Sequence, residues 1–330
     1  MRKLLTPAIL ALFLITSCTS VNETEDLRVA FYNVENLFDT VDDPSINDEE
    51  YLPDGRAKWD QEKYDHKINQ LARVLSSIDT TALPGIIGLC EVENKGVLED
   101  LTSHPKLIGG DYKIIHKNSP DFRGIDVALI YQNGTYKPIE NEWMNVTFPF
   151  DERTTRDILY SKGMIMGGQT VHIFVNHWTS RWGGAAETEP KRIFIANLIK
   201  EKTDEILEDD PMAQIIIMGD LNDNPTDKSL MENLISEDLY NLSAPKFANG
   251  EGTLYYRSWD LFDQMIVSKS LIDEQGIDVL NKTHDIFKTD WLLFTDNKGN
   301  KRPNRTGSGG RYYGGFSDHL AVSLVLHKLN

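Results

Sequence analysis

The residues with the clearest chemical potential lie near the C-terminus, where Ser317, Asp318 and His319 directly precede the apolar run 320–326. An acid and an imidazole thus stand side by side at the start of a predicted strand. Three earlier apolar runs end in polar residues of similar kind, namely Asn33, Glu91, and the pair Asp220 and Asn222. Burying charge is costly, so strand ends that repeatedly carry polar groups usually have a use for them.

Two of these residues are candidate ligands or supports for a cation. Glu91 ends the run Ile86–Cys90, and its carboxylate is a hard oxygen ligand suited to Mg²⁺, Mn²⁺ or Ca²⁺. Asn33 ends the run 28–32, where an amide could hold a loop, support a carboxylate or touch a phosphate. Taken singly, each is more typical of a solvated strand end or a helix cap.

Asp220 and Asn222 form the stronger signal. Residues two apart on an extended segment point the same way, so the two side chains are expected on one face. Asp220 could orient or activate a water molecule, and Asn222 could donate to a phosphate oxygen. The alternative is a tight turn, because Asp, Asn and Gly all favour turns. Both interpretations can hold together.

Two histidines stand at predicted strand ends. His177 ends one strand and His319 begins another. An imidazole that acts as general acid or base needs a carboxylate to fix its tautomer and stabilise its charged form. Asp263, at the start of a predicted strand, could serve His319, and Asp126 could serve His177.

Arginines and a tyrosine near these residues are candidate substrate contacts. Arg181 and Arg192 follow His177, and arginine can bind phosphate through two parallel hydrogen bonds. Arg311 and Tyr313 precede the C-terminal acid–imidazole pair, and a tyrosine there could stack on a base or sugar. The alternative is that these side chains pack to fix the loop.

The elements that must position these residues alternate along the chain. Nearly continuous apolar runs predict strands covered on both faces. These strands are Arg28–Val34, Ile86–Val92, Val127–Tyr131, Val171–Val175, Ile215–Met218, Leu261–Val267 and Leu320–Leu326. Helical spacing of apolar residues predicts helices over Glu62–Asp79 and Pro190–Glu208, the second starting at its proline. The pattern predicts a layered α/β sandwich, with sheets inside and helices outside.

Composition favours one large domain and excludes one class of partner surface. The chain has 330 residues, is 40% hydrophobic and carries a formal net charge of -17. A protein that binds polyanions through a broad basic surface would be basic, so diffuse nucleic-acid binding is disfavoured. A phosphate met locally by a cation and a few arginines is not excluded.

The N-terminus reads as a targeting segment. Arg2 and Lys3 precede an apolar stretch, 4–15, that is too short to span a bilayer comfortably. Small residues before Cys18 resemble a bacterial lipoprotein signal, with an ordinary secretory signal as the alternative. We therefore expect a signal peptide over 1–17, a lipidated Cys18 opening a polar tether over 18–27, and a single domain over 28–330. The expected location is the bacterial cell envelope, on the periplasmic side or the cell surface.

Lipidation of Cys18 would leave Cys90 without a disulfide partner. Cys90 lies in an apolar strand beside Glu91, so it is expected to be a small buried residue and not a nucleophile.

The polar residues in chain order resemble the endonuclease/exonuclease/phosphatase superfamily, from about Arg28 to the C-terminus. The residues that carry the resemblance are Asn33, Glu91, His177, Asp220 with Asn222, Asp263, and Ser317-Asp318-His319. The resemblance implies a four-layer αββα sandwich of two packed mixed sheets with outer helices. It also implies Mg²⁺, or a similar ion such as Mn²⁺ or Ca²⁺, held chiefly by Glu91 with Asn33 and Asp318 nearby and Asp220 as a further candidate.

The same resemblance implies roles for the remaining side chains. His319, oriented by Asp263, would help to activate the attacking water, with Asp220 as a rival for that role. His177 would contact the phosphate or assist the leaving oxygen, and Asn222 would steady the phosphoryl group. The metal ion would neutralise charge that develops in an in-line displacement.

The subfamily is less well marked than the reaction. Inositol 5-phosphatases have a Trp-Cys-Asp-Arg type segment where this chain has 261–264, and exonuclease III relatives have Arg where Phe262 stands. The first hypothesis is a lipid-anchored nuclease or related phosphodiesterase acting on DNA or RNA. The second is the same chemistry on a phospholipid, a sphingomyelin-like diester or a phosphomonoester. The third is a catalytically silent binding protein. Membrane contact is expected through the anchor alone, and no protein partner is implied.

Overall fold

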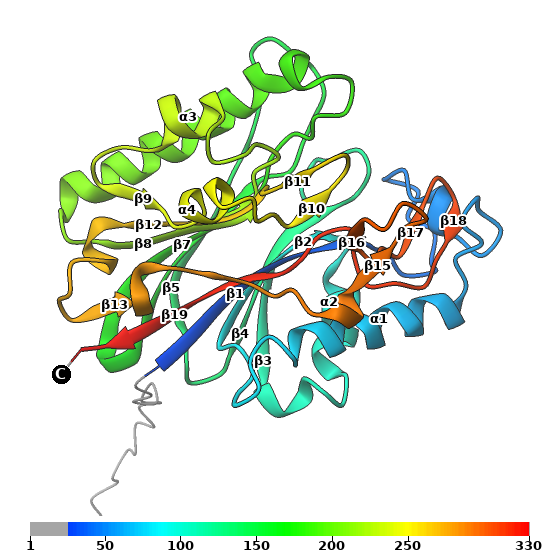
Figure 1. The fold of residues 1–330 in the computed structure, drawn as a ribbon, viewed down its shortest axis with the longest axis horizontal. Helices are drawn as coiled ribbons and strands as arrows, with labels where there is room; N and C mark the ends of the chain where they lie inside the picture. Colours follow the sequence, from blue (N-terminus) through cyan, green and yellow to red (C-terminus); the bar gives the residue numbers. More distant parts are fainter. Residues whose placement is uncertain (1–25, 330) are drawn as a thin grey trace, which may run out of the picture.

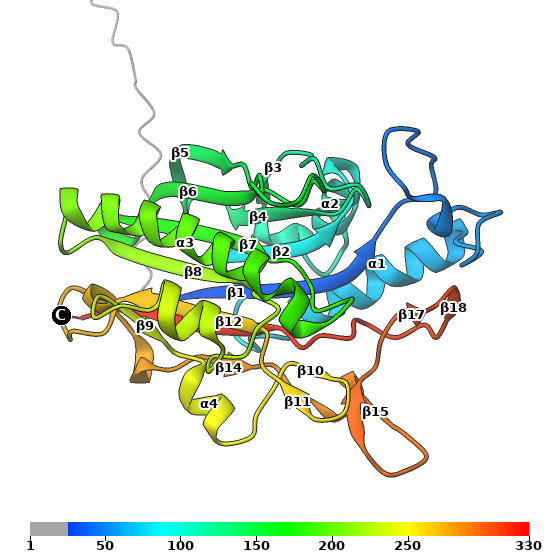
Figure 2. The ribbon, with the colours of Figure 1, turned by 90° about the horizontal axis from the view of Figure 1, so that it is seen from above.

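The computed structural model describes residues 26–329, which form two β-sheets packed face to face with helices on both outer faces (Figures 1 and 2). The helices are α1 (Gln61–Leu75), α2 (Lys95–Ser103), α3 (Ala185–Asp209) and the short α4 (Ala244–Ala248). The predicted α/β sandwich of mixed sheets with outer helices is confirmed. The predicted signal peptide and the lipidated Cys18 lie outside the described residues.

The first sheet has the strand order β13-β19-β1-β2-β4-β3, with β14 also paired to β19. Its strands are β1 (Asp26–Leu37), β2 (Ile86–Val92), β3 (Tyr112–His116), β4 (Asp126–Gln132), β13 (Ile277–Val279), β14 (Asp285–Ile286) and β19 (Val322–Lys328). Strands β1 and β2 are parallel, and the other pairings are antiparallel. The N-terminal and C-terminal strands of the domain are therefore neighbours (Figure 1).

The second sheet has the order β5-β6-β7-β8-β12-β9. Its strands are β5 (Lys137–Met144), β6 (Ile158–Ile165), β7 (Gln169–His177), β8 (Gln214–Asp220), β9 (Leu239–Asn241) and β12 (Asp263–Ser268). Here β7 and β8 form the parallel pair. Each sheet thus has two adjacent parallel strands near its centre, whose carboxyl ends can carry a shared site.

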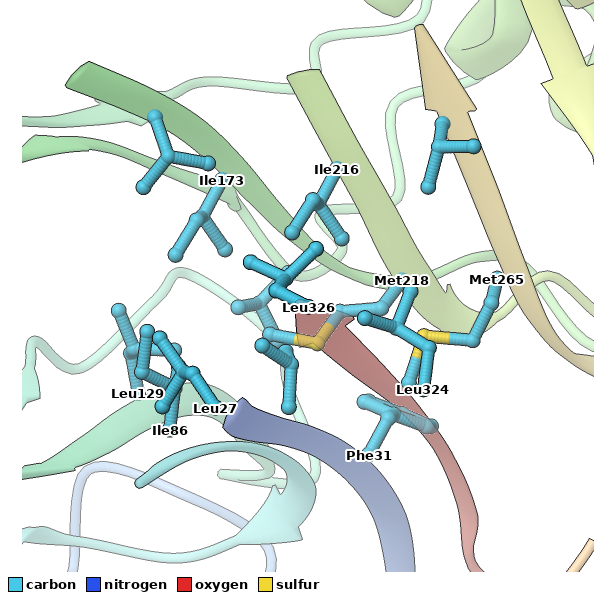
Figure 3. Packing of buried hydrophobic residues seen from close by; sticks show 14 of the residues in the cluster. Leu27, Phe31, Ile86, Leu129, Ile173, Ile216, Met218, Met265, Leu324 and Leu326 are labelled. Atoms are coloured by element: carbon cyan, nitrogen blue, oxygen red, sulfur yellow. The ribbon is translucent and has the colours of Figure 1, made fainter. Parts of the chain in front are cut away.

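The main core lies between the two sheets. Figure 3 shows Phe31 and Leu324 of the first sheet meeting Met218 and Met265 of the second, all with almost no exposed surface. A side chain added at Gly88 would come within 2.9 Å of the Met218 methyl group, so the sheets approach closely there. This packing fixes the register of one sheet over the other.

The outer helices cover the other face of each sheet. Leu71 and Leu75 of α1 join a second apolar cluster on the first sheet, and Ile195 and Ile199 of α3 join a third on the second sheet. The predicted helix starting at Pro190 is corrected, because α3 begins five residues earlier, at Ala185. Pro190 therefore lies inside the helix, where it removes one backbone hydrogen bond without ending it.

Three small hairpins and a long loop complete the fold. The hairpins are β10–β11 (Leu254–Tyr255 and Trp259–Asp260), β15–β16 (Leu293–Thr295 and Lys301–Pro303) and β17–β18 (Gly307–Ser308 and Arg311–Tyr312). The loop 39–60 contains the short 3-10 helix Glu49–Tyr51. No helix within residues 26–329 has the length and apolar character needed to cross a membrane.

Candidate active site

Strand ends from both sheets bring the polar residues to one edge of the sandwich. In the second sheet His177, the last residue of β7, is in register with Asp220, the last residue of β8. Asp220 is in turn paired with Asp263, the first residue of β12. In the first sheet Asn33 of β1 pairs with Cys90 of β2, one residue before Glu91. The topology therefore gathers residues that are far apart in the sequence.

Five polar side chains converge at this edge. The Nδ2 atom of Asn33 lies 3.2 Å from Oε1 of Glu91 and 3.0 Å from Oδ2 of Asp220. The Nε2 atom of His177 lies 3.7 Å from each of these carboxylate oxygens. The Nε2 atom of His319 lies 3.8 Å from the same Asp220 oxygen. Two carboxylates, one amide and two imidazoles thus face one small space.

The backbone around the site is held in unusual conformations. Glu35, Asn36, Glu91 and Asn222 all have φ between 51° and 62°, a region that non-glycine residues rarely occupy. The ladder between β1 and β2 shifts register between Asn33 and Leu37, and the ladder between β2 and β4 shifts between Cys90 and Val92. Such bulges re-aim side chains near active sites. The N–H of Asn36 then donates to Oε2 of Glu91 at 3.0 Å.

His319 is held by a buried carboxylate, as the sequence predicted. Its Nδ1 atom lies 2.7 Å from Oδ2 of Asp263, which also accepts a hydrogen bond from the hydroxyl of Thr253. Burial by itself would lower the pKa of His319. The charges of Asp263 and Asp220 outweigh burial and hold that pKa well above its usual value. The surroundings therefore favour the charged imidazole.

His177 has a different environment from the one predicted. Asp126 instead contacts Nε2 of His116 at 3.1 Å and accepts from the N–H of Ser119 at 2.8 Å, so its predicted pairing with His177 is wrong. Asp126 begins β4, whose register places it beside the β3 end. Within residues 26–329, Nδ1 of His177 is buried without a hydrogen-bond partner. Burial, with help from the nearby Arg156, lowers its pKa well below the usual value, so the neutral form is favoured.

Asp220 is the most enclosed acid of the convergent group. Burial raises its pKa to about 7, and the negative charges of Asp263 and Glu91 act in the same direction. Its Oδ1 accepts from the N–H of Asn222 at 3.0 Å. The side-chain amide of Asn222 donates to the carbonyl of Trp178 at 3.0 Å, so it braces the loop after β7. Asp220 and Asn222 therefore form a local turn, and Asp220 also faces the other polar side chains of the site.

The tripeptide Ser317-Asp318-His319 connects strand β1 to the segment before β19 at the site. The hydroxyl of Ser317 donates to the carbonyl of Asn33 at 2.7 Å and accepts from the N–H of His319 at 3.0 Å. Asp318 points elsewhere and pairs with Arg305 at 2.9 Å. The predicted strand 320–326 begins two residues later, at Val322, which leaves the tripeptide free of the ladder that β19 makes.

A second polar cluster beside Asp318 escaped the sequence analysis. Glu35 is buried and accepts from Nε of Arg305 at 2.9 Å and from the N–H of Thr306 at 2.6 Å. Burial, followed by the charge of Asp318, raises the pKa of Glu35 to about 7. Lys67 of α1, fully buried, donates to Thr306 and to the carbonyl of Phe316. The available signal was Glu35 two positions after Asn33, the same spacing of acid and amide as in Asp220 and Asn222.

The arginines predicted to contact substrate fall into two environments. Arg192 is 1% exposed, and its guanidinium lies 2.8 Å from Asp223. Arg181 pairs with Asp223 at 2.7 Å and with Asp227. Both are engaged within the chain. Arg311, in β18, is exposed and lies over the exposed ring of Tyr313.

The donor set fits a hard divalent cation. Among residues 26–329, Glu91 and Asp220 face each other across Asn33 and have no lysine or arginine partner. Two carboxylates in a largely buried place, whose only possible cationic partners in the described residues are imidazole nitrogens at 3.7 Å or more, are costly unless a further cation joins them. No group of three or more His, Cys, Asp or Glu side chains that could hold a metal ion occurs in the described part of the chain. An open site with one or two carboxylates and several waters is the arrangement that Mg²⁺ uses.

Cys90 behaves as expected. It is fully buried, and burial raises the pKa of its thiol well above the usual value, which opposes a role as nucleophile.

Comparisons with known proteins show the family and the fold of the chain. The model of the Endonuclease/Exonuclease/phosphatase family matches residues 28–328. No curated protein matches the chain in sequence. Three solved structures share the fold at low identity. Mannosyl-6-phosphatase Bt3783 from Bacteroides thetaiotaomicron is 18% identical, with a TM-score of 0.57 over 91% of this chain and 99% of that one. The human Nocturnin catalytic domain with bound sulfate is 17% identical, with a TM-score of 0.58 over 92% and 95%. TDP2 from D. rerio, complexed with a single-strand DNA product, is 15% identical, with a TM-score of 0.58 over 92% and 100%.

Proposed function

The chain belongs to the Endonuclease/Exonuclease/phosphatase family, and we propose that it is a divalent-metal-dependent hydrolase of phosphodiesters. The observation that carries this proposal is the convergence of Asn33, Glu91, His177, Asp220 and His319 at one edge, drawn from both sheets. A binding protein would have no need for two largely buried carboxylates without a lysine or arginine partner in residues 26–329, beside a carboxylate-held imidazole. Such costly groups are usually kept for chemistry.

Glu91 is the chief proposed metal ligand, with Asp220 facing it across the amide of Asn33. The bound Mg²⁺ would supply charge neutralisation at the phosphoryl group and the leaving oxygen. Asp318, predicted as a further ligand, is engaged by Arg305 at 2.9 Å and stands outside this proposed pair of carboxylates. Mn²⁺ and Ca²⁺ also prefer oxygen ligands, so the activity assay compares all three ions.

The reacting water is assigned to the space between Nε2 of His319 and Oδ2 of Asp220, which lie 3.8 Å apart. Oδ2 of Asp220, whose pKa burial raises to about 7, accepts the proton that the water loses as its oxygen attacks phosphorus. The charged imidazole of His319 orients that water by donating from Nε2 to its oxygen. Asp263 keeps the His319 ring oriented. The bond from phosphorus to the leaving oxygen breaks, and that oxygen takes a proton from solvent water to depart as the alcohol. The neutral His177 is placed to hold a phosphate oxygen by hydrogen bonding. Asn222 acts by bracing Asp220 and the loop at Trp178.

DNA or RNA is the first proposed substrate class. A phospholipid or sphingomyelin-like diester and a phosphomonoester are the alternatives on the same chemistry. We further propose that Cys18 is lipidated and anchors the domain at the bacterial envelope. A Cys18→Ser chain should then move from the membrane fraction to the soluble fraction. Unchanged membrane recovery would contradict the anchor without touching the enzymatic proposal.

The enzymatic proposal is tested with purified residues 26–330 and four substrates, namely plasmid DNA, RNA, bis-p-nitrophenyl phosphate and sphingomyelin. Each is assayed with Mg²⁺, with Mn²⁺, with Ca²⁺ and with chelator. Turnover should require metal and should fall on the order of a hundredfold or more in Glu91→Gln and in His319→Ala. Turnover in chelator, or full activity in both variants, contradicts the mechanism.

A further inference from the structure

A small pocket opens directly beside the reaction centre. It holds about 210 Å³ of water-accessible space between the loop 49–59 and the hairpin β17–β18. Glu35 and Asn36 line its inner end, and the N–H of Asn36 donates to Glu91. Arg305 lines it as well and pairs with Asp318. A group bound in this pocket would therefore lie next to the proposed metal ligands.

The walls of the pocket are aromatic and fixed in place. Tyr51, Trp59 and Tyr312 all line it. Tyr51 stacks on Phe38 with ring centroids 4.4 Å apart and an interplanar angle of 4°. Trp59 meets both tyrosines edge to face at 6.0 Å, and its indole N–H donates to the carbonyl of Phe38. Trp59 is only 2% exposed and fixes the part-buried Tyr51 and Tyr312, which thus offer preformed aromatic surface on which a ring can pack at little entropic cost.

The hairpin that closes the pocket is also anchored. Thr306, just before β17, is held by the buried Lys67 and by Glu35. The turn at Gly309 and Gly310 rests on Arg56, which donates to the carbonyl of Gly309 at 2.7 Å. A Cβ atom at Gly310 would lie 2.5 Å from the Arg56 side chain, and both glycines have positive φ. Only glycine lets the hairpin lie this close.

The rim of the pocket offers unused polar groups. Among residues 26–329, the side chains of Glu50, Ser308 and Arg311 have no hydrogen-bond or ion-pair partner, and all three line the pocket. These three side chains can form hydrogen bonds with the edge of a bound ring. The ring would carry hydroxyl, amine or carbonyl groups. The pocket is too small and too polar for an acyl chain, which requires a long apolar channel.

We infer that this pocket selects phosphoesters whose alcohol portion carries a polar ring, either the base of a nucleoside or a sugar, and disfavours lipid esters. This inference rests on the proposed hydrolase function. Tyr51 and Tyr312 hold the face of the ring, and Glu50 and Arg311 bond its edge. The pocket thereby determines the substrate class, whereas the convergent site performs the reaction.

The test uses methyl phosphodiesters that differ only in the second alcohol: a nucleoside, a hexose, glycerol and dodecanol. Binding to the His319→Ala protein is measured by calorimetry with Mg²⁺, and kcat/KM is measured with the wild type. We expect at least one ring ester to bind about tenfold or more tightly than the glycerol ester, the size of a base–aromatic stacking contribution. Preference for the nucleoside ester identifies a base pocket, and preference for the hexose ester identifies a sugar pocket.

Pocket variants make the result specific. Tyr312→Ala and Arg311→Gln, each in the His319→Ala background, should reduce the ratio of ring-ester to glycerol-ester affinity by about fivefold or more. Arg257→Gln is the matched control, because Arg257 is likewise exposed and lies over a neighbouring tyrosine, Tyr256, outside the pocket. Its ratio should stay unchanged.

Three results overturn the inference: equal affinity for ring and glycerol esters, tighter binding of the dodecyl ester, or a ring preference that survives both pocket variants. Binding of a ring ester without turnover of any ester contradicts the hydrolase and leaves the pocket assignment standing. Turnover of all four esters at equal efficiency contradicts the pocket assignment and leaves the hydrolase proposal standing.

Discussion

The Nδ1 atom of His319 lies 2.7 Å from Oδ2 of Asp263, a carboxylate with no exposed surface. This pair joins the C-terminal tripeptide to the first residue of β12. Because Asp263 both orients the ring and stabilises its charge, Asp263→Asn should lower kcat on the order of a hundredfold or more with little change in KM. The double variant with His319→Ala should be no worse than His319→Ala by itself, since the two act as one unit.

Asp26→Asn is the control for this prediction. Asp26 lies 2.6 Å from Nδ1 of His327 at the opposite end of β1, in a solvent-accessible pair of the same chemistry. Its kcat should match that of the wild type. Additive losses in the Asp263/His319 double variant would show that the two residues act independently.

The affinity of the enzyme for Mg²⁺ should depend on the carboxylate of Glu91. Its carboxylate has hydrogen-bond donors in Asn33 and Asn36 but no lysine or arginine partner within the described residues, so it is available to a cation. In Glu91→Gln the Mg²⁺ concentration for half-maximal activity should rise about tenfold or more, because an amide oxygen binds a hard cation more weakly than a carboxylate. Magnesium titrations of the rate measure this. Glu99→Gln, in an exposed pair with Lys95, should leave the midpoint in place.

Arg192 should contribute to stability and not to substrate affinity. It is buried against Asp223, and removal of one partner of a buried ion pair costs up to about 3–5 kcal/mol, with the lower end expected here because Asp223 keeps Arg181 as a partner. Arg192→Met should therefore lower the free energy of unfolding in urea by that order, with KM unchanged in the folded fraction. Arg181→Met, whose side chain is 28% exposed, should cost less. A raised KM at full stability would restore the substrate role for Arg192.

His284 should make the fold sensitive to acid. It is buried, neither ring nitrogen has a hydrogen-bond partner in the described residues, and burial lowers its pKa from 6.5 to about 3. As the pH falls below 6.5 the unfolded chain binds a proton that the folded chain refuses until about pH 3. Stability from the neutral imidazole is thus complete above pH 6.5 and declines toward pH 3, by up to about 1.4 kcal/mol per pH unit.

His284→Leu removes this titration. Its free energy of unfolding should depend less steeply on pH between 6.5 and 4 than that of the wild type, whatever its value at pH 7. His327→Gln, at an accessible position, serves as the control. Parallel curves for wild type and His284→Leu would show that the imidazole is not buried in neutral form.

The sequence by itself determined the elements and the residue types at their ends. Continuous apolar runs predicted β2 to the residue and the centres of β1, β7 and β8, because burial on both faces leaves a local signature in composition. The eight-residue strand β5 was missed, since all of its residues are exposed or half-buried and leave no apolar run. Acids and amides at strand ends were visible for the same local reason.

Only the tertiary structure decided which of these groups meet. Asp263 and His319 are 56 positions apart, and Ser317 and Asn33 are 284 apart, so no local pattern encodes their contacts. The register of the strands and the packing of one sheet on the other brought Asp220 to the centre. The same packing paired Asp126 with His116 and Arg192 with Asp223. It also brought Glu35, Arg305 and Lys67 together beside Asp318. Partner choice is a property of packing, and packing depends on all residues at once.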